Sequence, residues 1–329
     1  MPSKSVKGMI VAGPLANVSV AYRNKNYIAD RVFPIIDRVG SAAKILKYLK
    51  GAWFRDEAGI RGPGARAARG SFPYDYVDVS QKEYAFAKEV TDEDRDAAAE
   101  QGAPPVQPDQ DAIEFATDRV DLKKEVRVAA MIKAATWNGV AAGGTDAAGA
   151  FAAGAGNTFL SEMSAKKELI RSKTGFKPNA IVIDNGTYES LKLEATILDR
   201  IKYTQRGIVT ADLLAALLEL DFFLVGDAIK STAVEKKDGT DFTASNVWEV
   251  NAGKGMVFLF YRPASPGLKI PSAGYQARGA YKQAGGLARK TETWRENAEH
   301  QDVYEVAEKT DIVTVDTDLG YLWKDTLLT

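Results

Sequence analysis

The sequence predicts an α+β fold, in which an α/β unit is joined to a separate unit rich in β-strands. Three observations support this prediction: helical periodicity over residues 111–137, alternating helix and strand patterns over 162–225, and strand patterns again after Tyr275. Of the 329 residues, 45% are hydrophobic and 26% are charged, which is typical of a globular protein with a buried core. At this length we expect about two domains.

Basic residues are concentrated near the N-terminus. Among the first 50 residues, nine are Lys or Arg and two are Asp, in a chain whose net charge is -1. The first 50 residues therefore carry an excess of seven positive charges, which leaves -8 for the rest of the chain. Charge alone leaves two interpretations open: a solvated tail, or a segment that binds acidic surfaces of other copies or nucleic acid.

Two strands separated by a long connector are predicted after this basic segment. Residues 45–54 and 74–79 have strand patterns, and the second alternates strictly between polar and apolar side chains. The connector, residues 55–70, combines four arginines with four glycines and a proline, a composition that cannot bury a core of its own. We therefore expect a long β-hairpin with a basic tip, whose loop greatly exceeds the usual length of about two to five residues.

A long helix is predicted next. A short helix starts near Thr91, where a hydroxyl followed by acidic residues suits a helix N-terminus. After a proline-rich break at 103–110, residues 111–137 are expected to form a helix of about 40 Å. Apolar residues recur at helical spacing and predict one stripe: Phe115, Leu122, Val126, Ala129 and Ile132. The charged residues are assigned to the remaining surface: Asp118, Asp121, Lys124, Glu125 and Arg127.

An Ala- and Gly-rich connector, residues 139–156, leads to the α/β unit and is expected to be mobile or closely packed. Helices are predicted at 162–172, 187–193 and 211–220, and strands at 180–184, 222–225, 247–250 and 256–261. Further strands are predicted at 303–306, 311–315 and 321–323. We assign these C-terminal strands to a second, elongated β-rich unit around the long helix.

Little in the sequence indicates catalysis. The absence of Cys and the single His, His300, exclude disulfides, cysteine nucleophiles and multi-histidine metal sites. No P-loop, dinucleotide-binding fingerprint or Gly-x-Ser-x-Gly motif is present, and His300 is interpreted as a surface residue. We therefore assign no catalytic, cofactor-binding or metal-binding residue. The apolar stretch 8–15 is too short for a signal peptide or a membrane span, so we expect a protein made and used without crossing a membrane.

Several segments occur in a characteristic order along the chain. Ala29-Asp30-Arg31-Val32-Phe33-Pro34 precedes the hairpin at 45–79 and the helix at 111–137. The segments that follow are 175–188, 200–203, 209–214, 225–228 and 247–248. In this order, over nearly the whole chain, they resemble the N-terminal arm, extended loop, spine helix and axial domain of the major capsid proteins of tailed bacteriophages, which have the Hong Kong 97-type shell fold.

The resemblance implies how the chain is divided and what it does. The implied parts are an N-terminal arm (1–43), an extended loop (44–80), a peripheral domain (81–157 and 262–329, with the spine helix) and an axial domain (158–261). The implied function is structural and not enzymatic, and it requires no cofactor. Copies would assemble in the host cytoplasm into pentamers and hexamers that close into the icosahedral shell of the virion, around the double-stranded DNA genome.

The resemblance also implies partners and contact residues. The partners are other copies of the chain, a scaffolding protein and a portal during assembly, optionally a decoration protein, and packaged DNA through weak non-specific contacts; no membrane is involved. Candidate contacts between subunits are basic and aromatic residues of the arm and the loop: Arg23, Lys25, Arg31, Arg38, Trp53, Arg55, Arg61, Arg66 and Arg69. Because the chain begins directly with the arm, a separate scaffolding protein, or the prior removal of a scaffolding segment, is implied.

Some members of this family join their subunits by an isopeptide bond between a lysine of the loop and a distant asparagine. Here the loop lysines lie at its base, at Lys44, Lys47 and Lys50, and the tip carries only arginines. We therefore expect no such crosslink. Two alternatives remain open: an encapsulin, which has the same fold but packages a cargo enzyme, and an α/β enzyme of unknown reaction built on residues 180–226.

Overall fold

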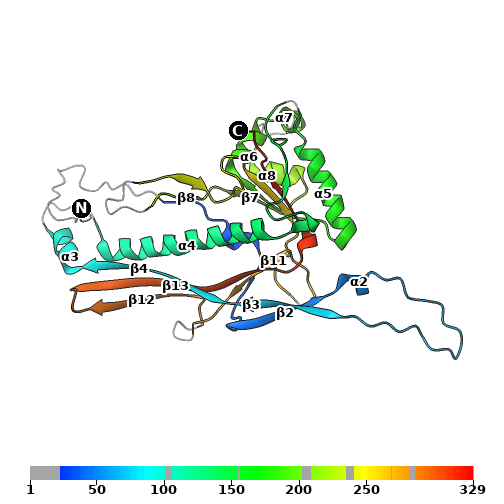
Figure 1. Ribbon diagram of the computed structural model, residues 1–329, viewed down its shortest axis with the longest axis horizontal. Helices are drawn as coiled ribbons and strands as arrows, with labels where there is room; N and C mark the ends of the chain where they lie inside the picture. The colour runs from blue at the N-terminus through cyan, green and yellow to red at the C-terminus, as the bar shows by residue number, and fades with distance from the viewer. Residues whose placement is uncertain are drawn as a thin grey trace.

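The structure is a computed structural model that describes residues 23–100, 106–154, 156–201, 209–234, 241–267, 269–281 and 286–328. Its described part has an elongated half, built on a five-stranded sheet and a long helix, and a compact half, built on a second five-stranded sheet covered by helices (Figure 1). A two-stranded ribbon with a long tip extends away from both halves. The α+β fold class is therefore confirmed.

The elongated sheet is centred on one long strand, β13 (Gln301–Thr314), which is antiparallel to three neighbours. Its partners are β4 (Lys82–Thr91), β12 (Arg289–Glu296) and β11 (Gly274–Arg278), and β1 (Ile35–Ile36) adds to β11 in parallel. The prediction of two separate strands at 303–306 and 311–315 was wrong. The two segments form one strand, because pairing with β4 runs without interruption from Gln301 to Thr310 and pairing with β11 continues from Thr310 to Thr314.

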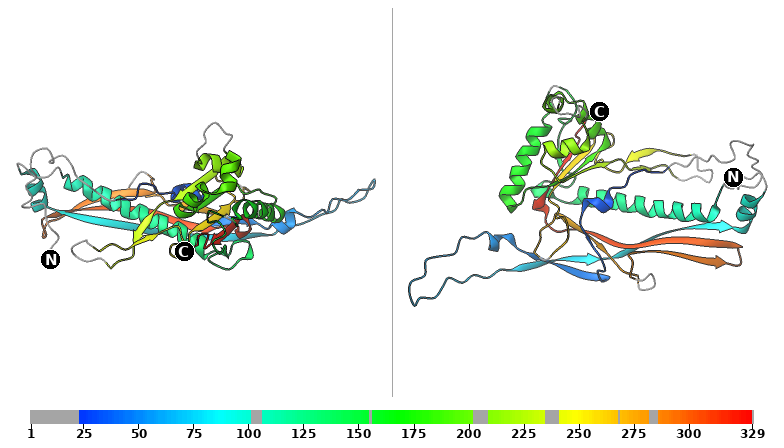
Figure 2. Two further views of the ribbon diagram at one scale, coloured as in Figure 1. Left: turned by 90° about the horizontal axis from the view of Figure 1, so that it is seen from above. Right: turned by 180° about the vertical axis from the view of Figure 1, so that it is seen from behind.

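The long helix α4 (Pro108–Ala134) covers one face of this sheet, as seen from behind in Figure 2. It starts and ends three residues earlier than predicted, because Pro108 suits the first turn of a helix and Ala135 is already extended. The shorter helix α3 (Asp92–Ala99) lies beyond the start of α4 at the far end of the sheet, and the Thr91 hydroxyl caps it as expected by accepting the Asp94 N–H at 3.2 Å.

The buried face of α4 differs from the predicted stripe. Phe115 is 42% exposed, whereas two residues assigned to the outer surface, Lys124 and Glu125, are buried. The residues that α4 buries are Ala112, Ala116, Val120, Lys124, Glu125, Val128, Ala129 and Ile132. The pattern failed because it treats every charged residue as solvated, and here buried partners from other segments compensate the two charges.

The compact half contains the predicted α/β unit. Its sheet has the order β5 (Thr145–Asp146), β14 (Gly320–Lys324), β10 (Met256–Phe260), β6 (Ala180–Asp184), β7 (Phe222–Gly226). Its helices are α5 (Phe159–Thr174), α6 (Asn185–Lys192), α7 (Ala195–Ile201) and α8 (Ala211–Leu217). Both faces of this sheet are buried, so alternate residues of its strands enter two different cores. On β10, Phe258 packs with Phe33 and Trp137, while Leu259 packs in the core of Phe159 and Trp323.

Two further strand predictions need correction. Residues 321–323 lie in β14, which pairs with β10 of the compact sheet and not with the elongated sheet to which we assigned it. Residues 247–250 are not a strand: the strand β9 (Ala244–Asn246) ends before them and pairs with β8 (Ile229–Ser231). Trp248 is instead fully buried in the core between the two halves of the fold.

The Ala- and Gly-rich connector is closely packed around Gly149 and Phe151, whereas others of its described residues, such as Ala142 and Gly154, are exposed. The Gly149 and Phe151 N–H groups donate to the backbone oxygens of Asp325 and Thr326, at 2.8 and 3.1 Å. A Cβ atom on Gly149 would lie 2.3 Å from the side chain of Leu328. Glycine is therefore needed here for close contact with the C-terminal segment, and no phosphate-binding loop is formed.

Candidate functional site

The extended loop, residues 44–80, is mostly exposed in the described chain. Its strands β2 (Ala42–Tyr48) and β3 (Tyr74–Ser80) form an antiparallel ribbon, so the predicted hairpin is confirmed. The first strand is shorter than predicted, because a helical turn, α2 (Lys50–Trp53), replaces its last residues. Every residue from Trp53 to Tyr76 is exposed, so this segment contributes nothing to the core of its own subunit.

The two faces of the ribbon differ in chemistry. Ala43, Ile45, Val77 and Val79 lie on the inward face, where Val79 is 2% exposed. The outward face carries three cross-strand pairs: Lys44 with Asp78, Leu46 with Tyr76, and Tyr48 with Tyr74. Near the base of the tip, the rings of Tyr48, Trp53 and Phe72 lie 6.0 Å apart in each pair and extend the aromatic surface.

Lysines at the base of the loop bind it to the segment that connects β13 of the elongated sheet to β14 of the compact sheet. The Lys47 ammonium donates to the backbone oxygen of Val315 at 2.8 Å and lies 3.6 Å from Asp316. Lys50 forms an ion pair with Asp318 of η3 (Thr317–Leu319). The loop is therefore fixed at its base and bare at its tip, which suits a segment that reaches another molecule.

The described part of the N-terminal arm packs on its own chain. The Asn24 side chain donates to the Ile229 oxygen at 2.9 Å and accepts its N–H at 3.0 Å. The Tyr27 hydroxyl donates to Asp118 at 2.9 Å, and burial, reinforced by this carboxylate, raises the pKa of Tyr27. The short helix α1 (Ala29–Val32) follows, with Val32 and Phe33 buried.

Glu125 of α4 anchors this part of the arm. Its carboxylate accepts the N–H groups of Ile28, at 3.1 Å, and of Ala29, at 2.8 Å, and also the indole N–H of Trp248 at 2.7 Å. Burial raises the pKa of Glu125, and these hydrogen bonds partly offset that effect. One carboxylate thus joins the arm, the long helix and the compact half.

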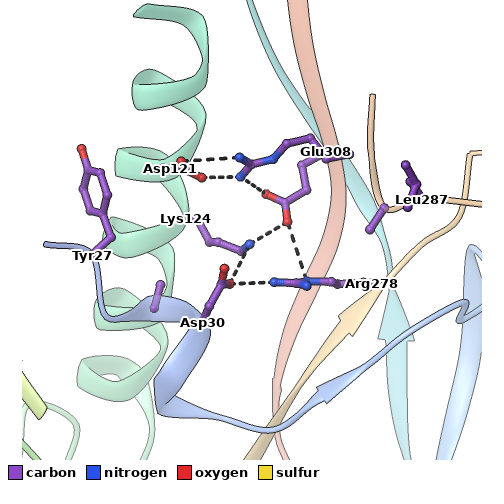
Figure 3. A pocket seen from close by; sticks show the side chains of 10 residues that line it. Tyr27, Asp30, Asp121, Lys124, Arg278, Leu287 and Glu308 are labelled. Carbon is purple, nitrogen blue, oxygen red and sulfur yellow. Dashed lines mark hydrogen bonds and ion pairs between the residues drawn. The ribbon is translucent and has the colours of Figure 1, made fainter. Parts of the chain in front are cut away.

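A second polar cluster joins the arm to the elongated sheet (Figure 3). Lys124 lies 2.8 Å from Asp30 and 2.6 Å from Glu308, and Arg278 lies 2.9 Å from Asp30. Arg289 pairs with Asp121 and Glu308. Burial acts to raise the pKa of Asp30, but Lys124 and Arg278 outweigh it and hold that pKa below its usual range. These side chains line an open pocket of about 430 Å³. The charges of the three acids and the three bases balance one another, so the cluster is a structural ion network and not a binding site for a charged ligand.

The structure separates the predicted contact residues into two groups. Arg23, Lys25, Arg31 and Arg38 are exposed on the arm, where Arg23 lies 3.5 Å from Glu114. The loop group is exposed around the tip: Trp53, Arg55, Arg61, Arg66 and Arg69. Of the loop arginines, Arg55 alone forms an ion pair within the described residues, with Glu57 at 3.3 Å. The structure does not bring the two groups together into one site.

Sequence reasoning missed four exposed apolar and aromatic residues of the loop: Leu46, Phe72, Tyr74 and Tyr76. The period-two alternation of 74–79 was the signal that could have found them, because it places Tyr74 and Tyr76 on one face. Among the described residues, no group of His, Asp and Glu side chains is arranged to hold a metal ion. His300 is exposed, as predicted. The helices described here are all too short or too polar to cross a membrane.

A long helix on an elongated sheet, a compact α/β half and a projecting ribbon are features shared with solved viral shells. A phage-related protein from Bordetella bronchiseptica matches 94% of this chain and 94% of its own, with a TM-score of 0.64 and 23% identity. The capsid of cyanophage P-SCSP1u has a TM-score of 0.61 at 13% identity, covering 98% of this chain and 94% of its own. The encapsulin of Synechococcus elongatus has a TM-score of 0.52 at 10% identity, covering 93% of this chain and 92% of its own. The fold is thus the Hong Kong 97-type shell fold.

Sequence similarity identifies the family within this fold class. No protein-family model matches the chain. The major capsid protein of Burkholderia phage BcepMu is 30% identical over 246 residues, which cover 72% of this chain and 75% of that protein. The chain belongs to the phage major capsid proteins. It is a structural protein of the virion capsid that assembles with copies of itself into the shell.

Proposed function

We propose that copies of this chain form pentamers and hexamers, which close into the icosahedral shell around the double-stranded DNA of a tailed phage. The observation that carries the proposal is the 30% identity to a phage major capsid protein over 72% of the chain. The shell needs no reaction, and we infer that the chain is not an enzyme. Assembly takes place in the host cytoplasm, with a scaffolding protein and a portal as partners and a decoration protein as an optional one.

The chain is divided into four parts in this proposal. The arm comprises residues 1–43 and the extended loop 44–80. The peripheral domain is the elongated sheet with α4, and the axial domain is the compact sheet with its helices. Because β5 and β14 pair within the compact sheet, the axial domain includes residues 145–146 and 320–324 in addition to 158–261.

The contacts between subunits use the exposed side chains of the loop and the arm. The loop side chains are free of the core of their own subunit, so docking them on a neighbour costs no internal packing. Each subunit meets several neighbours, and many modest contacts together hold a lasting shell although each alone is reversible. The net charge of -1 supports weak, non-specific contact with the packaged DNA.

Negative-stain microscopy with sedimentation velocity tests the proposal. The chain is expressed alone and together with a scaffolding protein encoded beside it, and we expect closed shells or free rings of five and six subunits. A monomer or dimer under both conditions contradicts the proposal. Nuclease-protected DNA in shells purified from infected cells supports the phage function, whereas a packaged enzyme in place of DNA would identify an encapsulin.

A further inference from the structure

One edge of the elongated sheet is uncovered. Both β4 and β12 pair with β13 over residues 301–308, so they lie on opposite sides of it. The long helix α4 packs on β4 and β13. Within the described chain, no strand pairs with the outer side of β12, which Figure 1 shows at the margin of the sheet, away from α4. The outward N–H and C=O groups of β12 are therefore open to another strand.

The shape and composition of β12 favour pairing with a further strand. Its register with β13 runs without a bulge from Arg289 to Glu296, and it contains neither Pro nor Gly. Proline, bulges and short length are the usual features that keep an edge strand from pairing with another chain. Thr291, Thr293 and Trp294 are exposed and belong to residue types that favour strands.

The charged side chains of β12 do not protect its edge either. Free basic side chains on an edge strand repel a second copy. Each basic residue of β12 instead forms an ion pair within its own chain: Arg289 with Asp121, Lys290 with Glu292, and Arg295 with Asp92. The strand therefore presents a nearly neutral edge to a partner.

The sequence of β12 is complementary to itself in one antiparallel register. Under a twofold axis perpendicular to the sheet, even-numbered residues meet even-numbered ones and odd-numbered residues meet odd-numbered ones. With Thr293 on the axis, Lys290 of each copy lies opposite Glu296 of the other. Trp294, which is 40% exposed, then lies opposite Glu292 and diagonally beside Trp294 of the other copy, so the two rings cover each other.

The two neighbouring symmetric registers are unfavourable. With Glu292 on the axis, the two Glu292 carboxylates oppose each other and Arg289 lies opposite Arg295. With Trp294 on the axis, Glu292 lies opposite Glu296. Like charges directly opposite each other destabilise a sheet, so the register centred on Thr293 is favoured.

We propose that the β12 strands of two copies of this chain pair edge to edge across a twofold axis at Thr293, so that one continuous sheet crosses the contact. Backbone hydrogen bonds supply the attraction, as in other cases of strand addition. The same surface is used by both copies, whereas the contacts that close a ring of five or six subunits join unlike surfaces. The β12 contact therefore joins subunits of neighbouring rings. The inference rests on the proposed shell function and names the surface that joins one ring to the next.

A single introduced cysteine tests the pairing, because the chain has no Cys of its own. In shells of the Thr293→Cys variant, the two thiols lie opposite each other with Cα atoms about 5 Å apart, within the range of a disulfide. We expect mild oxidation to convert most subunits into covalent dimers, as measured by non-reducing electrophoresis.

The matched control is Thr291→Cys, which is exposed on the same face of the same strand. In the proposed register Thr291 lies opposite Arg295, so the two copies of residue 291 are offset by four residues, or about 14 Å along the strands. This separation is too long for a disulfide, and we expect no dimers from the control.

Two charge variants test the same contact without oxidation. Thr293→Lys and Thr293→Glu each place like charges on the axis, so we expect the concentration at half assembly to rise by about tenfold or more in sedimentation velocity. Each copy has one partner across the axis, so in an equimolar mixture every contact can join unlike copies. We expect the mixture to assemble near the wild-type concentration, which also shows that both variants are folded.

Several results would disprove the pairing while the shell function stands. They are wild-type shells together with no dimers from Thr293→Cys, equal dimer formation by Thr291→Cys, charge variants that assemble as the wild type does, or a mixture that assembles no better than its components. A wild-type chain that never assembles, alone or with its scaffolding protein, overturns both the pairing and the shell function.

Discussion

Glu125 has no exposed surface, yet it carries an acidic group in the middle of the long helix. Three donors surround the carboxylate: the N–H groups of Ile28 and Ala29 and the indole of Trp248. A buried carboxylate is tolerated only where such hydrogen bonds replace those to water. The three donors, which are also buried, in turn need the Glu125 carboxylate as their hydrogen-bond acceptor.

Removing this carboxylate is expected to destabilise the subunit strongly. Glu125→Ala leaves three buried N–H groups without an acceptor, and we expect a loss of about 2–4 kcal/mol in the free energy of unfolding. Urea denaturation of unassembled subunits measures it. The control is Glu114→Ala on the same helix, an exposed residue whose loss changes stability by about 0.5 kcal/mol or less. Equal effects of the two substitutions would contradict the anchoring role of Glu125.

The raised pKa of Glu125 predicts a pH dependence. The folded state holds this proton to higher pH than the unfolded chain, so the stabilising contribution is complete below about pH 4.3 and is lost as pH rises through the raised pKa. The Glu125→Gln side chain cannot titrate. As pH rises through the pKa of Glu125, we therefore expect the unfolding free energy of this variant to increase relative to that of the wild type. Asp30→Asn is a control with the opposite sign. In the wild type the pKa of Asp30 is lowered, so the stability that Asp30 contributes is lost as pH falls through that pKa. Parallel pH profiles for Glu125→Gln and the wild type would disprove the assignment.

The burial of Lys124 and Glu125 could not be predicted from the sequence. The partners that make it possible are distant: Ile28 lies 97 residues before Glu125, and Glu308 lies 184 residues after Lys124. A periodicity argument considers one helix at a time and assigns charged residues to solvent. Only the assembled fold shows that arm, helix and sheet converge on these two side chains.

Among the elements, those with strong local signals were predicted best. The strand at 180–184 was found with its bounds because a short apolar run rich in β-branched residues is typical of a fully buried strand. The strand at 321–323 was assigned to the wrong half of the fold, since its pairing depends on contacts more than 60 residues away in the chain. Pairing between distant segments leaves no trace in local periodicity.

The turn before β10 illustrates how such distant elements are joined. Gly255 has φ +70, and a Cβ atom there would lie 2.6 Å from side-chain oxygens of Asp184, Thr187 and Thr326. Gly255→Ala is therefore expected to cost about 2–4 kcal/mol of unfolding free energy in a urea titration. Gly253→Ala is the matched control: its φ is +73 but no atom lies within 4 Å, so we expect about 1 kcal/mol. Equal losses would mean that backbone conformation alone, and not close contact, requires Gly255.

At the scale of the whole molecule, the sequence predicted the basic, flexible composition of the loop tip but not its place relative to the rest of the chain. The acidic residues that follow Thr91 were interpreted as part of a helix N-terminus, and the structure confirms the cap, because the Thr91 hydroxyl accepts the Asp94 N–H. Their position opposite the loop tip depends on the direction of the long helix and of the elongated sheet. The separation of the two ends becomes visible only in the folded chain (Figure 1).

The assembled shell is expected to be held without covalent bonds between subunits. Each lysine at the loop base has an acidic partner on its own chain: Lys44 lies 3.4 Å from Asp78, Lys47 lies 3.6 Å from Asp316, and Lys50 binds Asp318. No lysine lies in the exposed tip, where an ammonium could reach an asparagine of a neighbour, and the chain has no Cys. Purified particles boiled in detergent should therefore give a single band at the 35.6 kDa of the monomer on denaturing electrophoresis. A ladder of multimers that persists after boiling would contradict this prediction, and mass spectrometry of its cross-linked peptides would then identify the bond.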